Sequence, residues 1–237
     1  MLDWRATWKE LATPPWLAIL PLGSVEQHGP HLPIGFDWMV AEYLGKGVAA
    51  ALDAWLLPAQ PYSCAQEHQE FPGTISLRPA TLTALLTDIV ESLGRQGVPR
   101  LVILNYHGGN WALKSIVRDL NRQQQRVTVY PIASYEGVPG FDITTDMHAG
   151  AFETSQGLHL FPQLVRPVPC DTVPDVPRET LDQVGMGAIN PDGNWGLPST
   201  ATAERGAHDL AWMIEDSAQH IRKAIALVEA LKGKATA

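Results

Sequence analysis

A carboxylate and an imidazole lie two residues apart at the end of the first long apolar run. Glu26 and His28 close the run that begins at Trp16, and Asp37 follows after a stretch rich in glycine and proline. In an extended segment, residues i and i+2 point to the same face, so both side chains can face one ligand. Carboxylate oxygen and imidazole nitrogen are ligands that zinc and manganese accept. The spacing therefore predicts part of a divalent-metal site.

Three further segments combine histidine with acids or glycine. They are residues 67–74, 107–110 and 146–155, and with the first segment they hold most of the chain's eight histidines. Such concentration in a small part of the chain favours a common site. Each segment also has a simpler explanation, because a glycine pair after a strand can be only a tight turn. Likewise, the acids and the histidine of residues 146–155 can cap or solvate a helix that begins near Gly150.

The remaining histidines carry different expectations. His31 lies beside prolines, so we expect a loop residue or a residue that orients a ligand, rather than a metal ligand. His68 precedes a Phe-Pro-Gly turn and is either a site residue or a surface residue. His159 and His208 fall on predicted helices outside these segments, so we expect structural roles for them.

Strands and helices must alternate to position these segments. Apolar runs predict strands at residues 17–22, 55–59, 101–104 and 127–132. Helical spacing predicts helices at about 38–53, 79–96, 111–124 and 204–232, and the region 161–202, rich in proline and glycine, is expected to form long loops. This order favours a mostly parallel sheet with helices on both faces. Ligands gather beyond the carboxyl ends of such strands, where residues 26–28 and 105–110 are expected to meet.

Composition limits the class of protein. A chain of 237 residues, 45% hydrophobic and 18% charged, is an ordinary globular protein of one large or two small domains. A net charge of -8 without a basic stretch argues against nucleic acid as a partner. Without a signal-like N-terminus or a membrane-length apolar run, we expect a cytoplasmic protein with no membrane partner. Cys64 and Cys170 are isolated, so we expect two buried thiols, without a disulfide or a cysteine-based zinc site.

The motifs resemble those of the creatininase family of metal-dependent amidohydrolases. Residues 20–33, 71–77, 105–110, 148–155 and 196–202 carry the resemblance in the family's order. It implies one creatininase-like domain over residues 1–237, with a three-layer α/β/α sandwich around a mostly parallel sheet. It also implies two divalent cations per chain and a homohexamer. Zinc is the expected metal, with manganese or iron as alternatives.

The resemblance assigns the metal ligands residue by residue. Glu26, Asp37 and His107 would hold one cation. His28 and Asp37 would hold the other, so Asp37 would bridge the two. A further carboxylate is needed at the second cation.

One departure from the family concerns that carboxylate. Creatininase itself has a glutamate two residues after the histidine of the third segment, where this chain has Gly109. Glu153 is therefore the expected replacement. His148 aligns with the family's acid/base histidine. The residues expected to bind substrate or to orient ligands are His68, Gly108, Gly109, Asn110 and Asp146.

These assignments predict hydrolysis of a C–N bond in a cyclic or small amide by metal-activated hydroxide. His148 would pass a proton to the leaving nitrogen. Because Gly109 replaces a ligand of creatininase, a peptidase that trims a precursor, as in mycofactocin maturation, is the alternative. A non-catalytic, metal-stabilised oligomer would lack a ligand or the acid/base residue, yet all are present. A Rossmann-type nucleotide site is set aside, because no Gly-x-Gly-x-x-Gly follows a strand.

Overall fold

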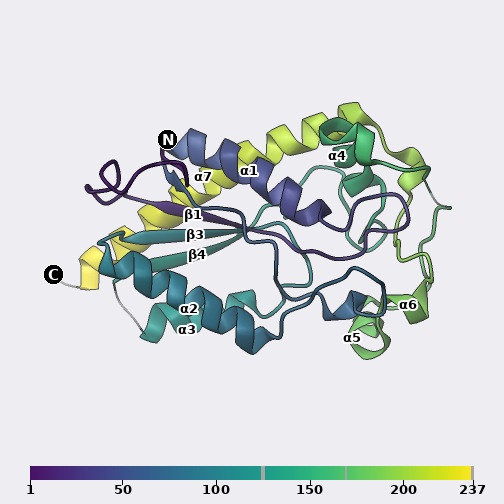
Figure 1. The fold of residues 1–237 in the computed structure, drawn as a ribbon, viewed down its shortest axis with the longest axis horizontal. Helices are drawn as coiled ribbons and strands as arrows, with labels where there is room; N and C mark the ends of the chain where they lie inside the picture. Colours follow the sequence, from purple (N-terminus) through teal and green to yellow (C-terminus); the bar gives the residue numbers. More distant parts are fainter. Residues whose placement is uncertain (124–125, 169, 236–237) are drawn as a thin grey trace.

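The computed structural model of this protein describes residues 1–123, 126–168 and 170–235. Its centre is a sheet of four strands in the order β2-β1-β3-β4, and every neighbouring pair is parallel. All four strands therefore end at one edge, towards the side where α4, α5 and α6 gather (Figure 1). This confirms the predicted parallel sheet. The strands are β1 (Ala18–Leu22), β2 (Trp55–Leu56), β3 (Arg100–Asn105) and β4 (Thr128–Ala133).

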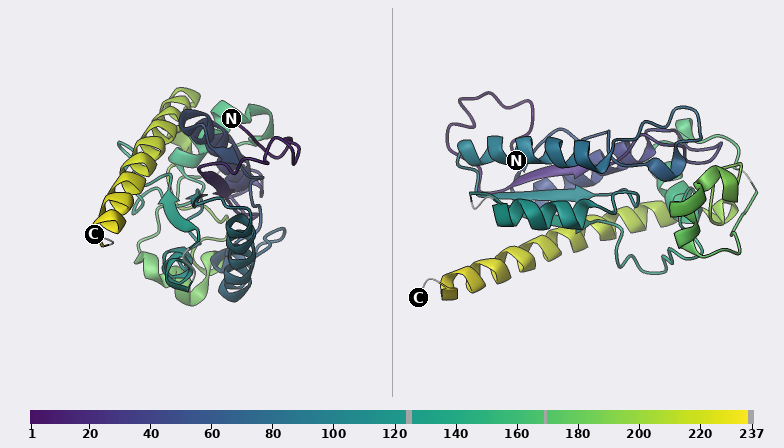
Figure 2. Two further views of the ribbon diagram at one scale, coloured as in Figure 1. Left: turned by 90° about the vertical axis from the view of Figure 1, so that its left-hand side faces the viewer. Right: turned by 90° about the horizontal axis from the view of Figure 1, so that it is seen from below.

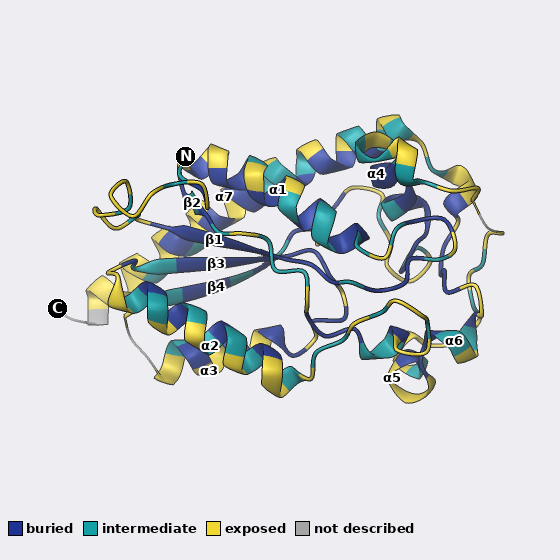
Figure 3. Ribbon diagram, in the orientation of Figure 1, coloured by how far each residue is buried: buried dark blue, intermediate teal, exposed yellow. Residues whose placement is uncertain are grey.

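Helices cover both faces of the sheet (Figure 2). Successive residues of a strand point to opposite faces, so Ile19 joins one core and Leu20 the other. The first core lies under α1 (Phe36–Leu52) and α7 (Ala203–Ala235), and the second under α2 (Pro79–Arg95) and α3 (Leu113–Gln123). The strands between them are almost wholly buried (Figure 3). The three-layer α/β/α sandwich is confirmed.

Two parts of the predicted secondary structure are wrong. The strand predicted at 55–59 ends at Leu56, because Pro58 has no N–H to donate, and pairing resumes only at a Leu22–Gln60 bridge. The predicted helix at 111–124 begins at Leu113, and residue 124 lies outside the described residues. The region 161–202 is not only loop. It contains η2 (Pro162–Leu164), η3 (Arg178–Thr180), α5 (Leu181–Val184), α6 (Met186–Ile189) and η4 (Pro198–Thr200).

The two thiols differ in exposure. Both are free, but Cys64 is buried and Cys170 is exposed. The prediction of two buried thiols is therefore wrong for Cys170, which lies in a surface stretch between η2 and η3. Among the described residues, no helix combines the length and the apolar character needed to cross a membrane.

Gly23 brings the end of β1 against the first turn of α1. A Cβ at this position would lie 2.5 Å from the backbone nitrogen of Trp38 and 2.6 Å from the carbonyl of Asp37. Real Cβ atoms do not approach backbone so closely, so the contact requires glycine. Helix α1 begins at Phe36, two residues earlier than predicted, so Asp37 lies in its first turn. This places Asp37 beside the segment that carries Glu26 and His28.

Candidate metal centre

Asp37 lies at the centre of a buried group of acids and imidazoles. Its Oδ1 is 3.0 Å from His28 Nε2, and its Oδ2 is 2.9 Å from His107 Nδ1. The Ser24 hydroxyl donates to Oδ2 at 3.0 Å. The first imidazole comes from the β1–α1 connection and the second from the end of β3. One carboxylate therefore faces imidazoles from two neighbouring strand ends.

Three sets of side chains each place three possible ligand atoms within 4.8 Å of one another. Asp37 belongs to two of these sets, which match the ligands expected for the two cations. His148 belongs to the remaining set, which brings the expected acid/base residue to the same place. The sets are Glu26–Asp37–His107, His28–Asp37–Glu153 and Glu26–His28–His148.

Backbone carbonyls orient the two imidazoles beside Asp37. His28 Nδ1 lies 3.1 Å from the carbonyl oxygen of Glu26, and His107 Nε2 lies 2.6 Å from that of Cys64. When these nitrogens carry the proton, each donates to its carbonyl and leaves the other ring nitrogen facing Asp37. This arrangement is the usual way in which a metal-binding imidazole is held.

Burial and mutual charge shift the pKa values in this centre. Burial raises the pKa of Glu26 to about 8 and that of Glu153 to about 7. Burial alone would lower the pKa of His28 and His107, but the adjacent carboxylates outweigh it and raise each to about 10. Burial opposes ionisation of Asp37, yet the two imidazoles hold its pKa below the usual range. The side chains thus share protons that a bound cation would replace.

His148 and His68 form a stacked pair beside Glu26, with ring centroids 4.2 Å apart. His148 Nε2 lies 2.7 Å from the carbonyl oxygen of Gln27, and its Nδ1 lies 3.8 Å from Glu26 Oε1. The Gln27 amide donates to His68 Nδ1 at 2.8 Å and to the carbonyl of Gly193 at 2.9 Å. Burial lowers the pKa of both imidazoles well below the usual value. Both rings are therefore neutral near pH 7.

Gln27 was missed in the sequence, although strand alternation provides a signal for it. Its neighbours on either side point to the metal centre, so its own side chain must point to the opposite face. There it joins the His68 loop to the loop that contains Gly193.

Gly109 leaves room for the carboxylate of Glu67. A Cβ on Gly109 would lie 2.1 Å from Glu67 Oε1 and 2.5 Å from His107 Nε2. Glu67 reaches this point from η1 (Gln66–His68), and it lines the same cavity as Glu153. The structure thus reveals a second acid near the missing side chain. Of the two, only Glu153 belongs to one of the sets with ligand atoms within 4.8 Å.

Asn110 braces the loop that carries His107. Its Oδ1 accepts the backbone N–H of Cys64 at 3.2 Å, and its Nδ2 donates to Asn105 Oδ1 at 2.8 Å. Cys64 in turn supplies the carbonyl beside His107. The neighbouring Gly108 is exposed and lines the cavity.

Asp146 differs from its predicted role as an orienter of a histidine. Its Oδ2 accepts the backbone N–H of Phe152 at 2.9 Å, at the start of α4 (Ala151–Leu160). Asp146 therefore caps the helix that carries Glu153. Ala149 precedes this helix in the left-handed region, with φ 49°, and its N–H donates to Glu153 Oε2 at 2.5 Å. The turn thus aims Glu153 towards the centre.

The other histidines lie outside the three ligand sets. His31 is buried, and its Nε2 lies 2.8 Å from Thr154 Oγ1. His159 and His208 are on α4 and α7 and are exposed or partly exposed, away from the centre.

The cavity over the centre is narrow, and a wider groove adjoins it. The cavity measures about 60 Å³ and the groove about 570 Å³, and they share Glu67 and Leu181 as lining residues. Arg178 also lines the cavity. It was not predicted, because it lies in the region expected to form loops and outside every histidine-bearing segment.

Comparisons with known proteins agree with this geometry. Residues 4–221 match the family model described as Creatininase: Creatinine amidohydrolase. The mycofactocin precursor peptide peptidase of Mycobacterium ulcerans (strain Agy99) is 35% identical over 223 residues, which cover 88% of this chain and 86% of that protein. The creatinine amidohydrolase of Pseudomonas putida is 31% identical over 252 residues, which cover 92% and 94%.

A solved structure of a mutant creatininase of the Zn-Zn type has the same fold. It superposes with a TM-score of 0.75 at 29% identity, over 94% of this chain and 97% of that one. The agreement extends over nearly the full length of all these proteins. This chain therefore belongs to the creatininase family.

Proposed function

We propose that this protein hydrolyses a C–N bond of a cyclic or small amide at a centre of two divalent cations. The observation that carries the proposal is the Asp37 carboxylate, whose two oxygens face His28 and His107 at 3.0 and 2.9 Å. One carboxylate shared by two ligand sets is the arrangement that a bridged pair of cations requires. Membership of this hydrolase family argues against the non-catalytic alternative.

The residues present fit cations of the expected type. Glu26 Oε2 is buried and has no hydrogen-bond donor among the described residues. A buried carboxylate oxygen needs such a partner or a cation. The donors are oxygens and imidazole nitrogens without a thiolate, which suits zinc, manganese or iron. Glu26, Asp37 and His107 would hold one ion, and His28, Asp37 and Glu153 the other.

The chain's own residues would bind and move protons around this pair. When bound, the cations would bring the pKa of water towards neutrality and polarise the amide carbonyl. His148, with its Nε2 beside the Gln27 carbonyl, presents Nδ1 to the cavity as a base. From there it can take a proton during attack and return it to the leaving nitrogen. The exposed backbone of Gly108 borders the space for the substrate.

Trimming of a peptide precursor is the second candidate. The 35% identity with the mycobacterial peptidase over most of both chains supports it. The adjoining groove of about 570 Å³ gives room for a peptide on one side of the scissile bond. A homohexamer is likewise proposed from the family resemblance.

Metal analysis and a hydrolysis screen test the proposal together. Protein purified without chelator should hold about two transition-metal ions per chain. With zinc, manganese or iron added, it should hydrolyse at least one of creatinine, other cyclic amides, formamides and short peptides. Failure to bind ions under any loading condition would contradict the two-cation centre. The class of compound that is hydrolysed decides between the two candidate functions.

Three variants test the residue roles. His148→Ala should keep both ions and lose about 10²- to 10⁴-fold in turnover, the usual contribution of a general acid/base. Loss of an ion in His148→Ala would instead make His148 a ligand. Glu153→Gln should lose one ion, whereas Glu67→Gln, the matched control in the same cavity, should keep both. The reverse result would assign the second carboxylate to Glu67.

A further inference from the structure

One permanently positive side chain lines the cavity over the metal centre. Arg178, at the start of η3, is the only Lys or Arg among the described residues that form this wall. In the described part of the chain, no ion pair or hydrogen bond joins Arg178 to a carboxylate, in contrast to Arg95 and Arg205. Its exposed guanidinium thus retains its full capacity to bind an anion.

The backbone beneath Arg178 is fixed. Leu181, three residues later, is 7% exposed and packs with Met186 and Trp195. Residues three apart on a helical turn lie on one side, and both Arg178 and Leu181 line the cavity. The charge also acts on Tyr135, whose pKa burial raises to about 12 while Arg178 opposes the rise. The guanidinium therefore lies over the cavity.

The available space limits what can approach this guanidinium. The cavity of about 60 Å³ admits the reacting group of a substrate, whereas the groove of about 570 Å³ can hold the remainder. A group attached close to the scissile bond must pass the rim where Arg178 lies. A planar guanidinium pairs with a carboxylate through two parallel hydrogen bonds, which makes a carboxylate its natural partner.

We infer that Arg178 binds a free carboxylate of the substrate. The substrate class would then be amides that carry a carboxylate near the scissile bond, such as an N-acyl amino acid or the C-terminal end of a peptide. This inference rests on the proposed function of the metal centre. Arg178 would act on substrate affinity and leave the bond-breaking step to the centre. Creatinine, which has no carboxylate, would be a poor substrate.

Matched acids and amides test this assignment. The probes are N-formylglycine against N-formylglycinamide, and glycylglycine against glycylglycinamide. Calorimetry on the zinc-loaded protein should show tighter binding of each acid by about tenfold, the low end for an exposed charge-assisted pair. Arg178→Gln should bring the ratio close to one, and Arg178→Lys should keep part of it. Arg118→Gln, which removes an exposed charge on α3, is the control and should keep the full ratio.

Binding is read without turnover, so the two proposals fail in different ways. An acid-to-amide ratio that Arg178→Gln leaves unchanged overturns the role of Arg178, because the carboxylate would then bind elsewhere. Equal binding of acid and amide by the unmodified protein, or no binding of either acid, overturns it as well. Missing ions, or no hydrolysis of any compound in the screen, would instead contradict the proposed function. Where turnover is found, the change in Arg178→Gln should fall on KM and leave kcat near its original value.

Discussion

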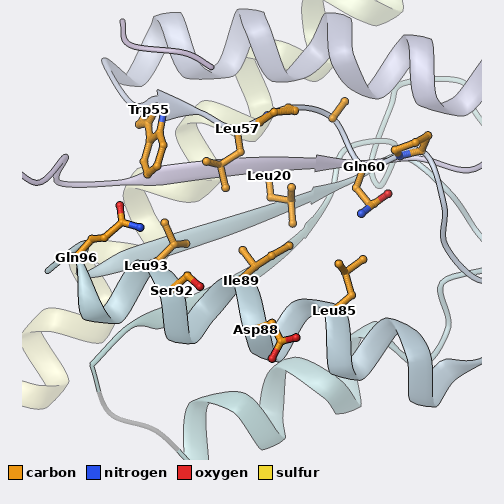
Figure 4. Close-up of a pocket in the computed structure, with 13 residues that line it drawn as sticks. Leu20, Trp55, Leu57, Gln60, Leu85, Asp88, Ile89, Ser92, Leu93 and Gln96 are labelled. Atoms are coloured by element: carbon orange, nitrogen blue, oxygen red, sulfur yellow. The ribbon is translucent and has the colours of Figure 1, made fainter. Parts of the chain in front are cut away.

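A groove between the edge strand β2 and helix α2 contrasts with the cavity over the metal centre. The groove measures about 580 Å³ and the cavity only about 60 Å³. Apolar side chains from β1, β2 and α2 face one another across the groove (Figure 4). The cavity is walled by acids and imidazoles. The main apolar residues of the groove are Leu20, Trp55, Leu57, Leu85, Ile89 and Leu93.

The difference shows that volume does not locate the chemistry of this protein. Burying an ionisable side chain costs free energy unless an opposite charge or a cation compensates it. The centre buries Glu26, His28, Asp37 and His107 together, each at most 3% exposed. The acid of the groove, Asp88, is exposed. Substitutions in the centre should therefore change metal content and turnover, and those in the groove should change only stability.

The largest effect is expected for Asp37→Ala. Because one carboxylate serves both ligand sets, its loss should remove both ions and lower turnover by about a thousandfold or more. Metal analysis and hydrolysis of the best substrate from the screen measure this. Asp88→Ala in the groove is the control and should keep both properties. A full metal complement in Asp37→Ala would show that the carboxylate does not bridge.

Gly109→Ala should weaken metal binding by about ten- to a hundredfold, the usual cost of disturbing the support of a ligand. The added methyl would overlap Glu67 Oε1 and His107 Nε2, at 2.1 and 2.5 Å. Competition with a chromogenic chelator gives the affinity. Gly108→Ala is the matched control, because a Cβ there meets nothing within 4 Å. A second change, Glu67→Ala, should restore much of the loss, and absence of both effects would mean that the loop adjusts freely.

The stability of the metal-free protein should fall as pH rises from 7 to 9. The pKa values of Glu26, Glu153, His28 and His107 lie above their unfolded values of 4.5 and 6.5, at about 8, 7, 10 and 10. Each raised group stabilises the fold fully below its unfolded pKa and loses this contribution as pH rises through the folded pKa. The native state binds more protons than the unfolded state in this range, so unfolding becomes easier.

Urea unfolding at pH 7, 8 and 9 with chelator measures this trend. His68 and His148 have lowered pKa values, so they are neutral in both states above pH 7 and do not oppose it. Bound zinc should remove the trend, because the ions replace the shared protons. A chelated protein that is as stable at pH 9 as at pH 7 would contradict the charge balance described for the centre.

The smallest effect is expected in the groove. Ile89→Ala, at a partly buried position of α2, should cost about 1 kcal/mol of stability and leave metal content and turnover unchanged. Leu86→Ala, at a fully buried position of the same helix, should cost more, about 2 to 5 kcal/mol. Urea unfolding with metal bound gives both values. A loss of turnover in Ile89→Ala at full metal occupancy would connect the groove to the reaction.

The elements that hold the centre could be predicted because their signals are local. A continuous apolar run marked the strand at 101–104, and helical spacing marked the helix that became α1. Parallel strands end at one edge, so residues that follow different strands were expected to meet there. Glu26, His28, Asp37 and His107 meet for this reason. Pro58 shortened β2 because one missing N–H outweighs the apolar pattern.

The sequence by itself determined the sheet, the family and the residues around Asp37, since each follows from spacing or from a motif. Only the tertiary structure decided that Glu67 fills the space beside Gly109 and that Arg178 lines the cavity. Both residues meet the centre from segments far away in the chain, through side-chain packing that no local pattern encodes. Their positions depend on how loops fold over the finished sheet, and loop contacts have no periodicity from which they could be inferred.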